Sequence, residues 1–121
     1  MPPNENPSRE ILERLEAVLV ERRESRPDGS YVVQLLDGGW PAIEAKIREE
    51  AGEVADAGRD ESDEALTREV ADLFFHVMVG LVARGVSIES VFEELGRRFG
   101  IGGLEEKAAR DTHGAKEGGA R

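Results

Sequence analysis

Between residues 62 and 85, large apolar residues recur every three or four positions. They are Leu66, Val70, Leu73, Phe74, Val77, Leu81 and Val82. A period near that of the α-helix places them on one broad face. Ser62 is a suitable N-cap before this run, and Gly85 a suitable C-terminal stop after it. We therefore predict a helix here that must pack its apolar face against other helices.

The same spacing predicts three more helices, over residues 8–24, 41–58 and 88–99. Ser8 and Ser87 are suitable N-caps, and Pro41 suits a first helical turn. These four helices predict an all-α fold, a helical bundle.

Three other segments are less regular. Residues 30–36 fit either a short strand or a helical turn, and Asp37-Gly38-Gly39 is expected to break the chain after them. Residues 104–110 form one short helix-like piece. We expect a single domain over residues 8–111, with a disordered Pro-rich segment before it and a flexible tail over 112–121.

Composition narrows the classes of function. The chain has 121 residues and only 5% aromatic residues, so its core is small and oligomerisation is expected to complete it. A net charge of −10 disfavours nucleic-acid binding. The lack of cysteine excludes thiolate metal sites and a Cys nucleophile. With no signal-peptide pattern and no membrane-length apolar run, we expect a cytoplasmic protein that does not bind membranes.

Two acidic pairs lie on the two central predicted helices. Glu50 and Glu53 are three residues apart, as are Glu69 and Asp72, so each pair shares a helix face. If the two helices pack antiparallel, the four carboxylates can meet between them. Glu50 falls only about 20° around the helix from Ile43, at the edge of the apolar stripe.

Carboxylates placed beside a packing face repel one another and lose hydration, and metal ions can compensate for this. Several carboxylate oxygens suit Mg²⁺, or alternatively Mn²⁺, which would also bind substrate phosphates. The competing interpretation is that these acids form ordinary solvated helix faces, as charge runs usually do.

Four basic or titratable residues are candidates for contacts with phosphate: Lys46, His76, Lys107 and Arg110. Lys46 lies one turn before Glu50, and His76 one turn after Asp72. Each has an ordinary alternative: a surface ion pair for Lys46, a packed side chain for His76, and a polar tail for the last two.

The acidic spacing resembles that of a known superfamily. Glu-Glu-x-x-Glu at 49–53 followed by Glu-x-x-Asp at 69–72 is similar to the motif of the MazG-type all-α nucleotide pyrophosphohydrolases. The Ser-Tyr segment within 27–35, the run at 72–76 and the stretch at 97–110 resemble the phosphoribosyl-ATP pyrophosphatase family within it. The resemblance spans residues 9–111.

This resemblance implies an activity: hydrolysis of 1-(5-phosphoribosyl)-ATP to the AMP form and pyrophosphate in L-histidine biosynthesis. It implies a Mg²⁺ site made by Glu50, Glu53, Glu69 and Asp72. It implies catalytic roles for Glu49, Glu50 and Glu53, with Glu49 as a ligand or base. It also implies substrate contacts by Lys46, His76, Lys107 and Arg110, and homodimers in which helices of two chains complete each site.

The chain departs from the family pattern at four places, one of which is Gly52, a small residue at a position that is often Thr or Ala. Arg48 replaces a frequent Gly, Trp40-Pro41-Ala42 replaces a polar segment, and Phe75 replaces a frequent Tyr. These changes bear on substrate contacts more than on the metal site. Two alternatives stay open: a MazG-like housecleaning enzyme acting on NTPs or dNTPs, and a non-catalytic helical interaction module.

Overall fold

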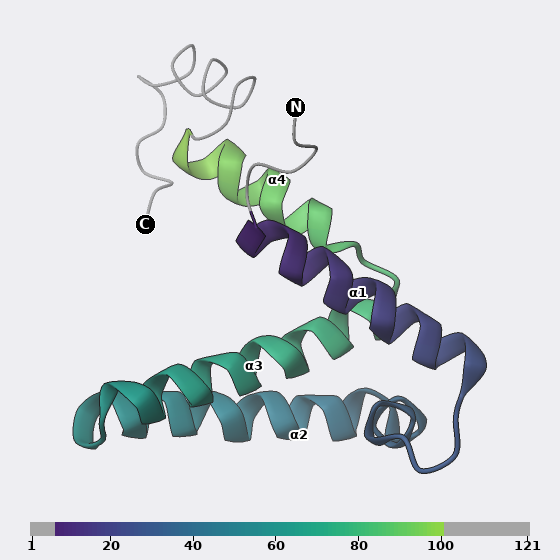
Figure 1. Cartoon of the computed structure of the whole chain (residues 1–121), viewed down its shortest axis with the longest axis horizontal. Helices are drawn as coiled ribbons and strands as arrows, with labels where there is room; N and C mark the ends of the chain where they lie inside the picture. Colours follow the sequence, from purple (N-terminus) through teal and green to yellow (C-terminus); the bar gives the residue numbers. More distant parts are fainter. Residues whose placement is uncertain (1–6, 101–121) are drawn as a thin grey trace. The chain divides into compact units, whose positions relative to one another are not determined.

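The computed structural model describes residues 7–100, which form four helices and the short segments between them (Figure 1). No strand occurs within this range, so the predicted all-α class is confirmed. The chain divides into two compact units, residues 1–86 and 87–121, which we describe separately. The expected N-terminal segment, the helix-like piece at 104–110 and the tail at 112–121 lie outside the described residues.

The first helix, α1 (Pro7–Ser25), agrees with the predicted range to within one residue at each end. The chain leaves it at Arg26, whose φ of 52° is in the left-handed region. The Arg26 guanidinium forms an ion pair with Asp37, which ties the connection to the next helix. Turn residues 27–29 then lead into that helix.

The second helix, α2 (Tyr31–Asp60), begins ten residues before the predicted start at Pro41. Ser30 caps it, because its Oγ accepts a hydrogen bond from the Val33 amide at 3.2 Å. Residues 30–36 are therefore helical rather than a strand. The expected break is a bend at Gly39, where φ is 73° and ψ is −171°. In Figure 1 the first turns of α2 are seen end-on, whereas the rest runs across the picture.

The third helix, α3 (Asp63–Arg84), has the predicted ends. The Ser62 hydroxyl oxygen accepts from the Ala65 amide at 3.1 Å. Gly85 ends the helix in the left-handed conformation, with φ 71°, and its N–H donates to the carbonyl of Leu81 or Val82. Local sequence signals are sufficient to define both ends of this helix.

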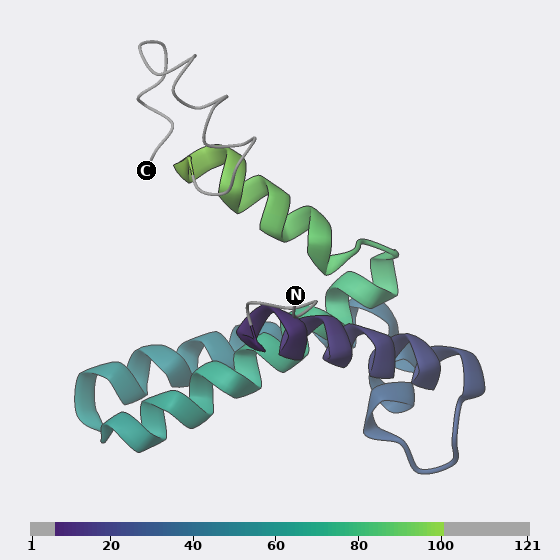
Figure 2. The same ribbon diagram turned by 45° about the horizontal axis from the view of Figure 1, so that its top comes forward.

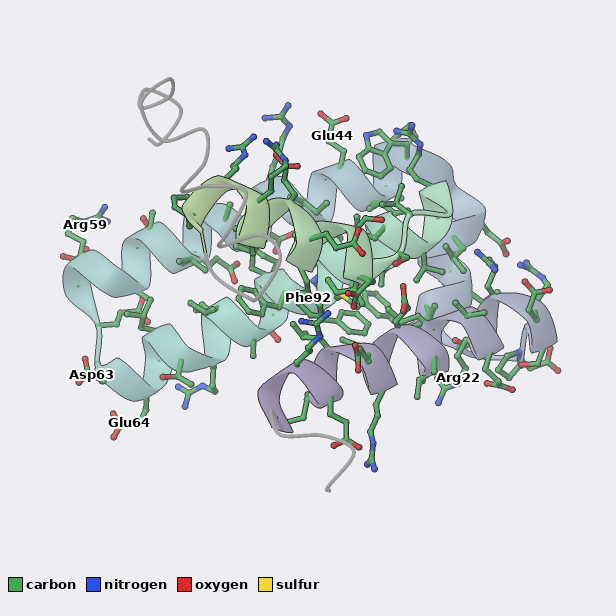
Figure 3. All side chains as sticks on the ribbon, turned by 90° about the horizontal axis from the view of Figure 1, so that it is seen from above. Arg22, Glu44, Arg59, Asp63, Glu64 and Phe92 are labelled. Carbon is green, nitrogen blue, oxygen red and sulfur yellow. The ribbon has the colours of Figure 1, made fainter. Side chains whose placement is uncertain are left out.

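Helices α2 and α3 form an antiparallel hairpin, and they lie side by side in two views (Figures 1 and 2). At its closed end, Arg59, Asp63 and Glu64 point outward (Figure 3). Gly80 permits close approach of the helices, because an added Cβ would lie 3.2 Å from the Trp40 ring. The buried apolar side chains of this unit are Leu19, Val32, Leu35, Ile43, Ala57, Ala65, Met78, Val79 and Val82.

Helix α1 packs against this hairpin, and the Arg23 guanidinium donates to the Val82 carbonyl at 2.9 Å. The Val82 carbonyl, which also accepts from the Gly85 N–H, thus links the C-terminal end of α3 to α1. The unit is therefore a three-helix assembly in which the α2–α3 pair supplies the long facing surfaces.

The second unit contains α4 (Ile88–Phe99), which has the predicted bounds. The Ser87 Oγ accepts from the Glu89 amide at 2.9 Å, and Gly100 ends the helix with φ 69°. Within residues 7–100, no single helix combines the length and apolar character that crossing a membrane requires; α3 and α4 meet that criterion only when taken together.

Candidate metal and active site

Three carboxylates from the facing surfaces of α2 and α3 come together. Glu50 on α2 and Glu69 and Asp72 on α3 each offer an oxygen, and these oxygens lie within 4.8 Å of one another. The antiparallel hairpin brings them together although almost twenty residues separate the two acidic pairs. The arrangement is an acidic cluster suited to a metal ion.

Burial makes this cluster unlike a solvated acidic surface. Glu50 is only 6% exposed, and its Oε1 has no hydrogen-bond partner among the described residues. Glu69 Oε1 likewise has no hydrogen-bond partner among the described residues. Buried carboxylate oxygens without partners are costly, and they are stabilised by a bound cation. The all-oxygen donor set fits a hard divalent cation such as Mg²⁺.

Glu53 stands outside this group of three but belongs to the same neighbourhood. A hydrogen bond with Glu69 is the main reason why the pKa of Glu53 is raised above its usual value. Partial desolvation and the negative charges of Glu69 and Glu49 raise this pKa further. The acidic residues therefore destabilise one another when all are ionised.

Lys46 lies against the α2 side of the cluster. Its Nζ is 3.2 Å from Glu49 Oε1 and 3.6 Å from Glu50 Oε2. The hydrogen bond to Glu49 raises the pKa of Lys46, and the nearby Tyr31, Glu49 and Glu50 add to the rise, while burial opposes it. Lys46 is 31% exposed at its side chain, so its ammonium is accessible as well as paired.

His76 is only 6% exposed, and both of its ring nitrogens have partners. Nδ1 lies 2.8 Å from the backbone carbonyl oxygen of Asp72, and Nε2 lies 2.8 Å from the Tyr31 hydroxyl. Tyr31 thus lies beside the site. The sequence indicated it only as part of the Ser-Tyr segment and did not predict a role for it. Its contact with His76 spans 45 positions, so no local motif could have indicated it.

The remaining two candidates, Lys107 and Arg110, lie outside the described residues. Glu49 is half exposed, with 52% of its side chain accessible, and it contacts Lys46. Of the candidates within residues 7–100, three share the cluster, and Glu49, Glu53, Lys46 and His76 lie beside one or more of its members.

Comparison with known proteins agrees with this geometry. The family model described as phosphoribosyl-ATP pyrophosphohydrolase matches residues 12–99. A phosphoribosyl-ATP pyrophosphatase of Erythrobacter litoralis is 50% identical over 99 residues, which cover 82% of this chain and 95% of the relative. Its counterpart in Vesicomyosocius okutanii is 43% identical over 103 residues, which cover 85% and 98%.

A third relative, the phosphoribosyl-ATP pyrophosphatase of Chromobacterium violaceum, is 46% identical over 101 residues, covering 84% of this chain and 94% of that protein. The matched region contains most of α1, the whole of α2, α3 and α4, and every carboxylate of the cluster. On the family match and these near full-length relatives, the chain belongs to the phosphoribosyl-ATP pyrophosphohydrolase family.

Proposed function

We propose that this protein hydrolyses 1-(5-phosphoribosyl)-ATP to 1-(5-phosphoribosyl)-AMP and pyrophosphate, as a cytoplasmic enzyme of L-histidine biosynthesis. The family match and the near full-length relatives that carry this activity in their names support the substrate. In the reaction, water adds across the anhydride between the α and β phosphates. One product keeps the α-phosphate, and the other two phosphates leave as pyrophosphate.

The observation that carries the proposal is the acidic cluster, in which Glu50 is buried, Glu69 is half-buried and Asp72 is exposed. Glu50, Glu69 and Asp72 would hold Mg²⁺, with Glu53 as a fourth ligand, and Mn²⁺ is an alternative with similar preferences. When bound there, the cation would neutralise phosphate charge and lower the pKa of a coordinated water. The two unpartnered carboxylate oxygens agree with that role.

We assign catalytic roles to Glu49, Glu50 and Glu53. Glu50 is buried, so its carboxylate is held in place by the packing around it. Glu49 is half exposed and adjacent to the cluster, where a carboxylate can accept a proton from the attacking water. The alternative role for Glu49 is that of a further metal ligand.

Substrate phosphates need positive charge nearby, because the cluster itself is anionic. Lys46 lies beside the cluster, since it forms ion pairs with Glu49 and Glu50. We propose that Lys46 meets a phosphate when substrate displaces these pairs. Lys107, Arg110 and His76 remain candidates for substrate contacts.

We further propose that the protein is a homodimer or a higher homo-oligomer. The well-exposed large apolar side chains of the first unit include two on α1 and two on α3: Ile11 (65%), Val18 (45%), Phe74 (52%) and Val77 (38%). Ile11 and Val18 lie on α1, and Phe74 and Val77 one turn apart on α3. Such exposed apolar surface is typical of an interface, and a second copy of the chain would cover it.

The direct test is pyrophosphate release in the presence of Mg²⁺, with phosphoribosyl-ATP compared with a panel of NTPs and dNTPs. Strong preference for phosphoribosyl-ATP supports the proposal. Turnover of dNTPs alone would point to a housecleaning pyrophosphohydrolase with the same metal chemistry. No release from any nucleotide would contradict enzymatic function and favour a helical interaction module.

A further inference from the structure

The Tyr31 hydroxyl is held in an unusually defined setting. It lies 2.8 Å from His76 Nε2, and the other ring nitrogen of His76 lies 2.8 Å from the Asp72 carbonyl oxygen. The Tyr31 ring also stacks on Phe75, with centroids 6.2 Å apart and planes 17° apart. Phe75 and His76 meet edge to face at 5.0 Å. Both the ring and the hydroxyl of Tyr31 are therefore fixed.

These contacts determine where the protons lie. A backbone carbonyl oxygen only accepts hydrogen bonds, so His76 Nδ1 must be the donor to Asp72. In the neutral imidazole, the other nitrogen, Nε2, is then an acceptor. With His76 in this neutral tautomer, Tyr31 donates its one hydroxyl proton to Nε2. The phenolic oxygen keeps its lone pairs and can only accept a further hydrogen bond.

This oxygen belongs to a half-exposed side chain near the candidate active site. Tyr31 is 44% exposed, whereas His76 is buried. Tyr31 is also close enough to Lys46 to contribute to the raised pKa of that ammonium. Lys46 in turn contacts Glu49 and Glu50. An oriented acceptor and a cation thus stand beside the carboxylate cluster.

We propose that Tyr31 accepts a hydrogen bond from a ribose hydroxyl of the substrate, and that His76 is the positioning residue that holds the Tyr31 oxygen as an acceptor. This inference rests on the proposed function. Ionised phosphate oxygens have no proton to give, so an acceptor-only phenol does not bind them, whereas ribose hydroxyls do donate. In this assignment Tyr31 recognises the sugar, and Lys46 the phosphate.

The first test replaces Tyr31 by Phe, which keeps the ring and removes the hydroxyl. We expect the KM for phosphoribosyl-ATP to rise about tenfold with kcat within about twofold, because the lost contact is remote from the bond that breaks. Thr67→Val is the matched control, since within residues 7–100 the Thr67 hydroxyl donates to the Asp63 carbonyl at the start of α3. Unchanged KM in folded Tyr31→Phe would overturn the proposal.

Two substitutions of His76 separate positioning from packing. Gln can place an amide oxygen near the site of Nε2 and so keep an acceptor for Tyr31. Asn is shorter and reaches only the Asp72 carbonyl. We expect His76→Gln to keep a near-normal KM and His76→Asn to raise KM toward the Tyr31→Phe value. Equal KM values in the two variants would contradict the positioning role, even if both lose thermal stability.

A spectroscopic measurement keeps this inference separate from the proposed function. The chain has two histidines, His76 and His113, and a His113→Gln variant assigns their ¹⁵N signals. We expect His76 to carry its proton on Nδ1 in the free protein. A proton on Nε2 would overturn the inference even if the wild type cleaves phosphoribosyl-ATP. Absence of turnover by the wild type would instead refute the proposed function, and with it the assignment of a ribose ligand.

Discussion

Glu50, which we propose as a metal ligand, differs from a carboxylate on the protein surface. It is 6% exposed and has one oxygen without a partner among residues 7–100, although Lys46 lies 3.6 Å from the other. A charge in such a position weakens the metal-free fold and is stabilised when a cation binds. Glu50 therefore lowers the stability of the metal-free protein, and the same charge would bind the cation.

Substituting Glu50 by Gln separates these two effects. We expect the variant to melt at a higher temperature than the wild type in EDTA, because a buried charge is removed. We also expect Mg²⁺ to raise its Tm less than it raises that of the wild type, because a ligand is lost. Differential scanning calorimetry with and without Mg²⁺ measures both. A lower Tm in EDTA together with an unchanged Mg²⁺ shift would contradict this account.

Glu53 gives the metal-free protein a characteristic pH dependence. Its folded-state pKa is raised, first by the hydrogen bond with Glu69, so protonation favours the folded state. Its contribution to stability is complete below the unfolded pKa of about 4.3 and is lost as pH rises through the higher folded pKa. In EDTA, the Tm of the wild type should therefore fall relative to that of Glu53→Gln as pH rises above about 4.

Mg²⁺ should abolish or reverse this trend, because metal binding requires the deprotonated carboxylates. The measurement is Tm against pH for the two proteins, in EDTA and in Mg²⁺. Comparing the variant with the wild type cancels groups such as Glu94, whose pKa is lowered by Arg98 and Arg97. A constant difference across the pH range in EDTA would show that Glu53 is not destabilised by its neighbours.

At the scale of the elements, the bend in α2 is centred on Gly39, and Pro41 follows two residues later inside the helix. Gly39 adopts φ 73° and ψ −171°, a conformation that residues with a Cβ avoid. The bend joins the turn that carries Tyr31 to the long segment that carries Lys46 and Glu50. It is therefore part of what positions the site.

Gly39→Ala should destabilise the protein by about 1–3 kcal/mol. Gly52→Ala is the matched control, because Gly52 lies in regular helix with nothing within 4 Å of an added Cβ. That control should stabilise the protein by about 0.5–1 kcal/mol. Urea unfolding gives both values. Changes of the same sign and size in the two variants would show that the bend does not require a glycine.

The elements also show which parts of the fold a sequence can predict. The ends and face of α3 follow from Ser62, Gly85 and the apolar spacing between them, all of which act locally. The start of α2 cannot be predicted in this way, because the sequence of residues 30–36 fits a strand or a helical turn equally well. Gly38-Gly39 suggested a break between elements, whereas only Gly39 leaves helical geometry.

The candidate site, too, was predictable from the sequence only in part. The two acidic pairs were visible from their three-residue spacing, and antiparallel packing of two predicted helices was enough to expect them to meet. The hydrogen bond between Tyr31 and His76 was not visible, since it depends on where the capped first turn of α2 lies against α3. Long-range contacts of this kind need the tertiary structure.

At the scale of the whole molecule, the exposed apolar residues on α1 and α3 bear on assembly. Phe74 is 52% exposed, and it lies on the same helix as Glu69 and Asp72. If a second chain covers this surface, the candidate site and the interface are neighbours. A substitution that disrupts the interface should then also lower the activity.

Phe74→Glu tests this connection. We expect the variant to shift from oligomer to monomer in light scattering after size exclusion, because a charge is costly in an apolar interface. We also expect its pyrophosphatase activity to fall at least tenfold. Thr67→Glu, an exposed substitution on the same helix, is the control for added charge. A wild type that is already monomeric would refute the proposed assembly.

The central claim is that the carboxylates between α2 and α3 carry out metal-dependent hydrolysis. Its most direct test is the steady-state rate of pyrophosphate release from phosphoribosyl-ATP by wild type and Glu53→Gln in Mg²⁺, with exposed Glu64→Gln as the control. We predict that Glu53→Gln loses at least about a hundredfold in kcat while its circular dichroism is unchanged. A folded Glu53→Gln protein that keeps most of its rate would contradict the four-carboxylate site.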